Sequence, residues 1–176
     1  MAGAEDLPDG AGDLDYIVSG LVLNFVADPN RAIARMKQRL RRGGMIAAYV
    51  WDYADGIEFL RRFWDEAVEL DSATADLDES RRFPLCQPET LKALFLEASL
   101  RNVTVGALEI PTLFQDFKDF WTPFLRGTGP APAYVASLSQ ERRDLVRDRL
   151  ARSLTVEADG SISLKARAWA VRGVLE

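Results

Sequence analysis

The segment Leu14–Trp51 constrains the fold most, because two apolar stretches flank one amphipathic stretch within it. Leu14–Val26 is rich in β-branched and aromatic residues and nearly continuous in apolar character, as in a parallel strand that is covered on both faces. Gly20 is expected to end this strand early, which leaves the rest as a loop and a first helical turn. Met45–Trp51 is predicted to be a second buried strand. A strand, a helix and a strand in this order form a right-handed crossover with parallel strands.

The amphipathic stretch predicts a helix over Pro29–Arg42. Asp28 can cap its first turn, and proline suits the first helical position. Its apolar residues recur at helical spacing, and its last turn is basic, which the helix dipole favours. Gly43 or Gly44 is expected to end the helix in the left-handed conformation.

The rest of the chain predicts further helices and strands within a single domain over residues 1–176. No internal repeat or low-complexity segment interrupts it. Apolar residues at helical spacing predict helices, β-rich alternation predicts strands, and polar stretches predict loops. Helices are expected at Ile57–Leu70, at 87–100, at 115–122 and after Ser139, strands at 101–114 and 160–176, and loops at 71–80 and 126–132.

Composition excludes several classes of function. The chain has 176 residues, a net charge of −5 and scattered basic residues, which argues against a nucleic-acid groove. It has no histidine, so His-based triads and His metal sites are excluded and we expect no metal. The single cysteine, Cys86, suits a reducing compartment. Tyr16–Ala27 is too short to span a bilayer, and residues 1–10 have no signal-peptide pattern. We therefore expect a cytoplasmic protein without nucleic-acid or membrane partners.

Short sequence motifs in the first third of the chain, and the order in which they occur, resemble those of class I S-adenosylmethionine-dependent methyltransferases. In that family a strand of the form D-x-V/I-x-S precedes a segment D-P…R-x-L-R-P-G-G. The matching residues are Asp15, Ile17, Ser19, Asp28, Pro29, Arg39, Leu40, Gly43 and Gly44, with Arg42 in place of the usual proline. The later stretch 87–105 resembles a helix–strand unit of the same family.

The resemblance implies an α/β fold. It would be a partial Rossmann-like methyltransferase sheet, mostly parallel, with an antiparallel carboxyl-terminal strand and helices on both faces. Leu14–Ser19 and Met45–Trp51 would be its parallel core. The final strand, about Leu164–Val174, would lie antiparallel between Met45–Trp51 and Val103–Ile110.

The family's glycine-rich G-x-G-x-G loop is absent from the sequence, as is the acidic residue that binds the ribose hydroxyls of the cofactor. The chain thus resembles the carboxyl-terminal half of the family, and Gly3 stands where the adenine loop usually has aspartate. The implied cofactor is S-adenosylmethionine, which this chain alone is expected to bind weakly or not at all. An in-frame D-x-G-x-G-x-G upstream of Met1 would indicate a misplaced start or a truncation, and its absence a true fragment.

Five residues are candidates for cofactor binding by this resemblance. Ala4 and Glu5 would lie near adenine, and Ser19, Gly20 and Leu21 near the methionine end of the cofactor. Ligands of open α/β sheets bind beyond the carboxyl ends of the strands, which fits the second group. The alternative for that group is a tight turn out of a buried strand.

The resemblance also implies that segments at about 53–85 and 111–138 shape the pocket for the methyl acceptor. Such pockets are mostly apolar, and these segments contain many aromatic residues. The candidates for substrate binding are Trp51, Tyr53, Phe63 and Trp121. The alternative is that these rings pack in a helix–sheet core. No catalytic residue is singled out, because methyl transfer often needs only proximity and alignment, although Asp52 or Tyr53 could orient or deprotonate an acceptor.

Two functions follow from these patterns. The first is an S-adenosylmethionine-dependent methyltransferase, or a truncated homologue, that transfers a methyl group to a small, partly apolar acceptor. The second is a catalytically inactive methyltransferase-like fragment that acts in protein–protein association. A nicotinamide-dependent oxidoreductase is weaker because no G-x-G-x-x-G occurs in the chain.

The same resemblance predicts an exposed sheet edge. Without the family's first three strands, Leu14–Gly20 is expected to be an edge strand. It has no lysine or proline and no obvious bulge that would protect it from pairing. We expect a homodimer, or a complex with a separately encoded amino-terminal half. The alternative is that residues 1–10 fold over the edge.

Overall fold

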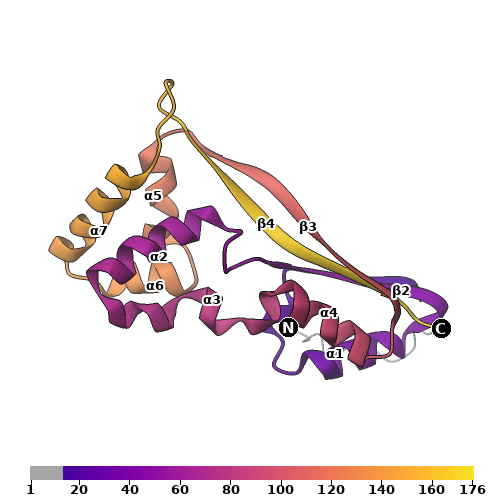
Figure 1. The fold of residues 1–176 in the computed structure, drawn as a ribbon. Coiled ribbons are helices and arrows are strands. Elements are labelled where there is room, and N and C mark those ends of the chain that lie inside the picture. Colours follow the sequence, from indigo (N-terminus) through magenta and orange to yellow (C-terminus); the bar gives the residue numbers. More distant parts are fainter. Residues whose placement is uncertain (1–13) are drawn as a thin grey trace. The chain divides into compact units, whose positions relative to one another are not determined.

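The computed structural model describes residues 14–176, which form an α/β fold with four strands and intervening helices (Figure 1). The strands are β1 (Leu14–Gly20), β2 (Leu40–Trp51), β3 (Arg101–Phe114) and β4 (Ile162–Val174). The helices are η1 (Leu23–Phe25), α1 (Pro29–Lys37), α2 (Glu58–Leu70), η2 (Ser72–Leu77), α3 (Glu79–Arg82), η3 (Pro84–Cys86), α4 (Pro88–Glu97), α5 (Phe117–Arg126), α6 (Pro130–Ser137) and α7 (Gln140–Ser153). No helix within residues 14–176 has both the length and the apolar character needed to cross a bilayer.

The sheet has the order β1-β2-β4-β3. β1 and β2 are parallel, with Tyr16 opposite Met45 and Gly20 opposite Tyr49. β4 runs antiparallel to β2 and lies between β2 and β3. The predicted parallel crossover and the predicted insertion of the last strand are therefore both confirmed.

The joint between α1 and β2 differs from the sequence prediction. Asp28 caps α1, as expected, by accepting a hydrogen bond from the backbone N–H of Arg31 at 2.9 Å. The helix nevertheless ends at Lys37, and β2 already begins at Leu40, so the predicted end at Arg42 is wrong. Gly43 has a left-handed φ of 78°. It lies within β2, where the β1–β2 register is irregular, and does not cap a helix. A glycine that can adopt positive φ suits both uses, so the residue alone did not distinguish them.

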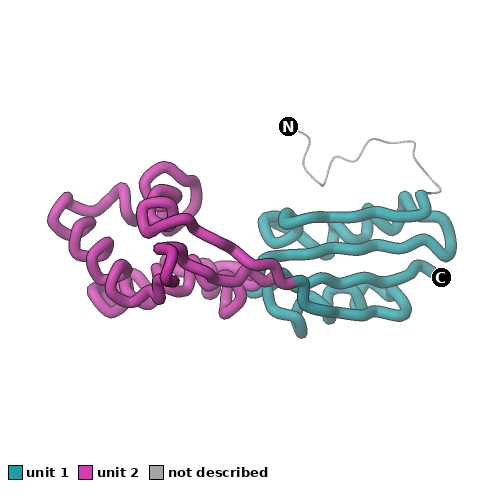
Figure 2. The backbone as a smooth tube through the Cα atoms, turned by 90° about the horizontal axis from the view of Figure 1, so that it is seen from above, with its two compact units in different colours: residues 1–51, 84–108, 168–176 teal, residues 52–83, 109–167 magenta. Residues whose placement is uncertain are grey.

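The chain divides into two compact units, which Figure 2 shows in different colours. In the described residues, unit 1 consists of 14–51, 84–108 and 168–176, and unit 2 of 52–83 and 109–167. The divisions fall within β3 and β4, so both strands contribute residues to each unit.

Within unit 1, the two faces of the sheet differ in burial. Ile46, Ala48 and Val50 of β2 are at most 2% exposed. α1 and α4 lie on one side of the strands (Figure 1), and a Cβ built on Gly173, the β4 partner of Ile46, would meet the Phe95 ring of α4 at 3.3 Å. These helices therefore cover the Ile46 face. On the opposite face, Tyr16 and Val18 of β1 are 69% and 67% exposed.

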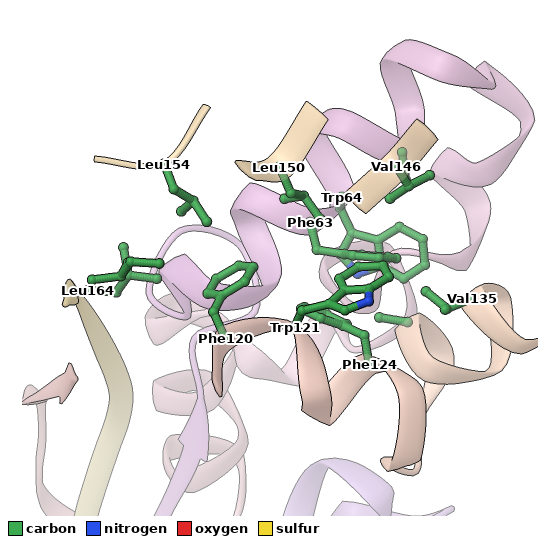
Figure 3. Packing of buried hydrophobic residues seen from close by; sticks show 13 residues of the cluster. Phe63, Trp64, Phe120, Trp121, Phe124, Val135, Val146, Leu150, Leu154 and Leu164 are labelled. Atoms are coloured by element: carbon green, nitrogen blue, oxygen red, sulfur yellow. The ribbon is translucent and has the colours of Figure 1, made fainter. Parts of the chain in front are cut away.

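Within unit 2, helices pack around an aromatic core (Figure 3). Its large buried rings come from α2 and α5, and aliphatic residues of α6 and α7 complete the cluster. Ser139 caps α7, as predicted, by accepting from the backbone N–H of Arg142. Three predictions were wrong here: α5 continues past Pro123 to Arg126, residues 72–82 form η2 and α3, and α6 begins at Pro130, inside the predicted loop 126–132.

Candidate functional site

The carboxyl end of β1 is a tight turn that packs against β2. Leu21 adopts a left-handed φ of 56°, and its backbone N–H donates to the Tyr49 carbonyl at 2.8 Å. A Cβ on Gly20 would lie 2.7 Å from Cζ of Tyr49 and closer still to its hydroxyl, so any larger residue here would displace the Tyr49 ring. Ser19 and Gly20 are partly exposed. The structure therefore brings Ser19, Gly20 and Leu21 together at the strand end, where a ligand of an open α/β sheet binds.

Asn24 lies three residues beyond this turn, in η1, and its side chain is incompletely paired. Its Nδ2 atom is buried and has no hydrogen-bond partner in the described part of the chain. Buried amide donors are usually satisfied, and leaving one unpaired costs roughly 1–3 kcal/mol. The sequence analysis did not select Asn24, although it is a polar residue inside an apolar run. Its unmet donor makes Asn24 a candidate residue that sequence reasoning missed.

S-adenosylmethionine fits this end of the sheet only in part. Its methionine carboxylate is a hydrogen-bond acceptor, which the unmet Nδ2 donor of Asn24 and the Ser19 hydroxyl can complement. The sequence contains no glycine-rich loop for close backbone approach to the cofactor. Ala4 and Glu5, predicted to lie near adenine, fall outside the described residues. Of the predicted cofactor-binding residues, the structure therefore describes only Ser19, Gly20 and Leu21.

The carboxyl end of β2 leads into a turn that is held by a partly buried ion pair between Asp52 and Arg167. Trp51 ends the strand opposite Ala168 and is partly exposed. Asp52 is 2% exposed and accepts from the backbone N–H groups of Ala54 and Asp55 at 3.1 and 3.2 Å. Its other oxygen accepts from Nε of Arg167 at 2.7 Å, and this hydrogen bond raises the pKa of the guanidinium. All of these contacts hold the turn in place, so the Asp52 carboxylate has a structural role.

Three of the predicted acceptor residues lie in unit 2, in well-packed positions. Tyr53 is 8% exposed and packs on Phe83 with ring centroids 5.4 Å apart. Phe63 and Trp121 are 0% and 7% exposed and belong to the aromatic core, where both pack on Phe124 (Figure 3). Phe63 and Trp121 therefore pack in a hydrophobic core, which is the alternative that the sequence left open for these rings.

Unit 2 also contains an open pocket of about 510 Å³ near α2 and α3. It is lined by Trp64, Asp65, Val68, Glu69, Ala75, Asp78 and Arg81. This volume lies in the range of small-molecule sites, although the lining is more charged than is typical of them. None of the four predicted acceptor residues lines this pocket.

Two carboxylates near this pocket have opposite pKa shifts. Burial raises the pKa of Glu79, which is 4% exposed and accepts from Nε1 of Trp64 at 2.5 Å. Burial also acts to raise the pKa of Asp78, but hydrogen bonds from Arg61 and from the Ser80 backbone outweigh it and lower the pKa. The Arg61–Asp78 contact is bidentate, at 2.7 and 2.5 Å. These contacts join α2 to α3, and no sequence pattern predicted them.

Comparisons with known proteins find similarity to methyltransferases. A family profile described as a methyltransferase domain matches residues 1–48. A curated relative, methyltransferase ucsB of an Acremonium species, is 30% identical over 121 residues, which is 58% of this chain and 42% of that protein. The chain thus spans less than half the length of this relative.

One solved structure shows a similar fold, and a second aligns with a lower score. A candidate methyltransferase from Bacillus halodurans C-125 aligns with a TM-score of 0.53 and 12% identity, over 98% of this chain and 68% of that one. Phosphoethanolamine N-methyltransferase 2 of Haemonchus contortus, in complex with phosphomonomethylethanolamine and S-adenosylhomocysteine, aligns with a TM-score of 0.48 and 15% identity, over 98% of this chain and 36% of that one.

The strand order and the parallel crossover define a Rossmann-like α/β fold. Within that class, the family profile and the curated relative confirm the predicted resemblance to class I S-adenosylmethionine-dependent methyltransferases. S-adenosylmethionine is the cofactor that this resemblance implies.

Proposed function

We propose that residues 14–176 form the acceptor-side part of a methyltransferase that transfers a methyl group to a small, partly apolar acceptor. The observation that carries the proposal is the strand order β1-β2-β4-β3, with antiparallel β4 inserted between β2 and β3. When bound, the cofactor would supply an electrophilic sulfonium methyl group. An O, N or C atom of the acceptor would take up this methyl group, and the electron pair of the broken carbon–sulfur bond would stay on sulfur. The protein's task is then to align the two reactants and to exclude water.

For the cofactor, we propose that Ser19, Gly20 and Leu21 bind the methionine end and that Ala4 and Glu5 lie near adenine. Asn24 would donate from Nδ2 to the methionine carboxylate, because this donor is buried and unmet in the described residues. A hydrogen bond to a charged acceptor contributes about 1.5–3 kcal/mol.

For the acceptor, we propose that segments 53–85 and 111–138 shape the pocket, with Trp51 and Tyr53 nearest the ligand. Both segments belong largely to unit 2, which supports their acting together. Phe63 and Trp121 would support the pocket from the aromatic core, since both are buried there.

Isothermal titration calorimetry of the 176-residue chain with S-adenosylhomocysteine tests the cofactor part. We expect a dissociation constant weaker than about 0.1 mM, because the glycine-rich loop and the ribose-binding carboxylate are missing from the sequence. Asn24→Ala should weaken binding at least roughly tenfold, for the loss of about 1.5–3 kcal/mol. Asn30→Ala, an exposed asparagine of α1, is the matched control and should leave binding unchanged.

Two results would count against this proposal. A low-micromolar dissociation constant would mean that a different or completed site exists. Equal affinities for the Asn24→Ala and Asn30→Ala proteins would remove Asn24 from the cofactor site.

The second candidate function is a catalytically inactive methyltransferase-like fragment that acts in protein–protein association. The exposed side chains of Tyr16 and Val18 on β1 favour it. Absence of an in-frame glycine-rich motif upstream of Met1, together with no methyl transfer under any condition, would select this function over the enzyme.

We also propose that the chain associates through β1, either with a second copy or with a separately encoded amino-terminal half. The position of β1 at the end of the described strand order supports an available edge. Residues 1–10, the alternative cover for this edge, lie outside the described residues. A cytoplasmic location stays a proposal, which the single buried cysteine, Cys86, supports.

A further inference from the structure

Tyr49 of β2 lies directly beside the carboxyl end of β1. Gly20, the last residue of β1, is its partner in the parallel pair. Side chains alternate between the two faces of a sheet, so Tyr49 projects from the face opposite the buried Ala48 and Val50. The exposed side chain of Val18, whose partner is Ala47, lies on the same face as Tyr49. Tyr49 is thus on the face of β2 that does not meet α1 and α4.

The Tyr49 ring extends from β2 across Gly20. A Cβ built on Gly20 would lie 2.7 Å from Cζ and 3.0 Å from Cε1 of this ring, and closest of all to the hydroxyl oxygen. Neighbouring strands lie roughly 4.8 Å apart, so a side chain as long as tyrosine can reach from one strand over the next. The absence of a side chain at Gly20 therefore lets the hydroxyl of Tyr49 lie at the end of β1, between Ser19 and Leu21 in the sequence.

The Tyr49 hydroxyl is a hydrogen-bond donor that the described residues leave unused. Within residues 14–176 this hydroxyl forms no hydrogen bond, and the side chain is partly exposed, so a ligand can reach it. The Nδ2 atom of Asn24, three residues after Leu21, is a second donor without a partner in the same range. The turn at Ser19–Leu21 thus has one unused donor opposite it on β2 and another that follows it in η1.

A carboxylate is the ligand group that best matches these donors. An ionised carboxylate only accepts hydrogen bonds, has room for about four of them, and forms stronger ones than a neutral acceptor does. No Asp or Glu occurs between Asp15 and Asp28, so no acidic side chain of the turn or of η1 would repel a bound anion.

We propose that Tyr49 is a cofactor-binding residue whose hydroxyl donates to the amino-acid carboxylate at the methionine end of S-adenosylmethionine. This inference rests on the proposed cofactor site at Ser19, Gly20 and Leu21, and it adds to that site a residue from a second strand. It also gives Gly20 a role in binding, because only a residue without a side chain leaves room for the phenol at the strand end.

An NMR titration of the ¹⁵N-labelled 176-residue chain with S-adenosylhomocysteine tests this role, with the amides of Ser19, Gly20 and Leu21 as reporters. Tyr49→Phe keeps the ring over Gly20 and removes only the hydroxyl. It should raise the dissociation constant at least roughly tenfold, as expected for a lost hydrogen bond to a charged group. Tyr16→Phe is the matched control, because it removes a hydroxyl from a 69% exposed tyrosine nearer the amino end of β1, and it should leave the dissociation constant unchanged.

A second ligand tests which group Tyr49 contacts. An analogue of S-adenosylhomocysteine that lacks only the carboxylate should bind to the wild-type and Tyr49→Phe proteins with equal affinity. A tenfold difference that persists with this analogue would overturn the assignment to the carboxylate.

The outcomes separate this inference from the cofactor site on which it rests. Amide shifts at Ser19–Leu21 with equal dissociation constants for the wild-type and Tyr49→Phe proteins would overturn the role of Tyr49 and leave the site standing. No shifts in the wild-type chain would overturn both. If Tyr49→Phe fails to fold, wild-type protein with ¹³C at the tyrosine Cζ positions decides. The Tyr49 signal should move when S-adenosylhomocysteine is added and the Tyr16 signal should not, and a stationary Tyr49 signal would overturn the proposal.

Discussion

Gly56→Ala should destabilise the chain strongly, because Gly56 lies in the turn that the Asp52–Arg167 ion pair holds. A Cβ at this position would lie 2.6 Å from Cβ of Asp52 and 2.8 Å from Cβ of Arg167. Ordinary contacts begin at 3.4 Å, and both of these atoms are bonded directly to backbone, so neither can rotate away. The Gly56 N–H donates to the Asp52 carbonyl at 3.0 Å, and the Arg167 N–H donates to the Gly56 carbonyl at 2.9 Å, which prevents the turn from moving freely.

The magnitude of this effect has two parts. Overpacking in a tight site costs about 1–3 kcal/mol. If the turn shifts, Asp52 also loses its partner while 2% exposed, and breaking a buried ion pair costs about 3–5 kcal/mol. If the turn relaxes in part, the free energy of unfolding should fall by about 2–4 kcal/mol. For a chain of this size, that lowers the melting temperature by roughly 10 °C.

Thermal unfolding followed by circular dichroism measures this loss. Gly106→Ala is the matched control, since no described atom lies within 4 Å of a Cβ at Gly106. It should stay within about 0.5 kcal/mol of wild type. The reasoning is refuted if the Gly56→Ala and Gly106→Ala proteins melt at the same temperature.

Two further substitutions test buried polar groups. Asn24→Leu should raise the free energy of unfolding, measured by urea denaturation, by about 1 kcal/mol, because it removes an unpaired Nδ2 donor. A loss of stability would show instead that this donor is satisfied. The Glu79→Gln protein should gain stability relative to wild type as pH rises from 4 to 7. The pKa of Glu79 is raised in the folded state, so the wild-type protein loses stability as pH rises from the unfolded-state pKa to the folded-state pKa, and glutamine does not. Glu157→Gln, at an exposed glutamate, is the control for the pH series, and a pH-independent difference for Glu79→Gln would contradict the buried-carboxyl argument.

The fold was predictable where the signals were local or matched a known order of elements. The apolar strands and the Asp28 cap indicated the crossover from β1 to β2. The insertion of β4 next to β2 joins residues far apart in sequence, so only the family resemblance could supply it. Helix α6 was missed because Pro130 resembles a loop residue, although proline is also favoured in the first turn of a helix.

The candidate site was less predictable, because its contacts are long-range. Asp52 and Arg167 are separated by 115 positions, and nothing in either local sequence marks their pairing. The helical spacing of Phe63 gives one apolar face without saying whether that face meets a ligand or a core. The close approach of Tyr49 to Gly20 depends on the strand register, which a single sequence does not provide.

We propose that the turn after β1 binds the methionine end of S-adenosylmethionine. Chemical-shift mapping of the ¹⁵N-labelled chain with millimolar S-adenosylhomocysteine tests it most directly. The claim predicts fast-exchange shifts that cluster on the amides of Ser19, Gly20, Leu21 and Asn24, including the Asn24 side-chain NH₂. Shifts confined to the charged pocket of unit 2, or no shifts at saturating ligand, would contradict it.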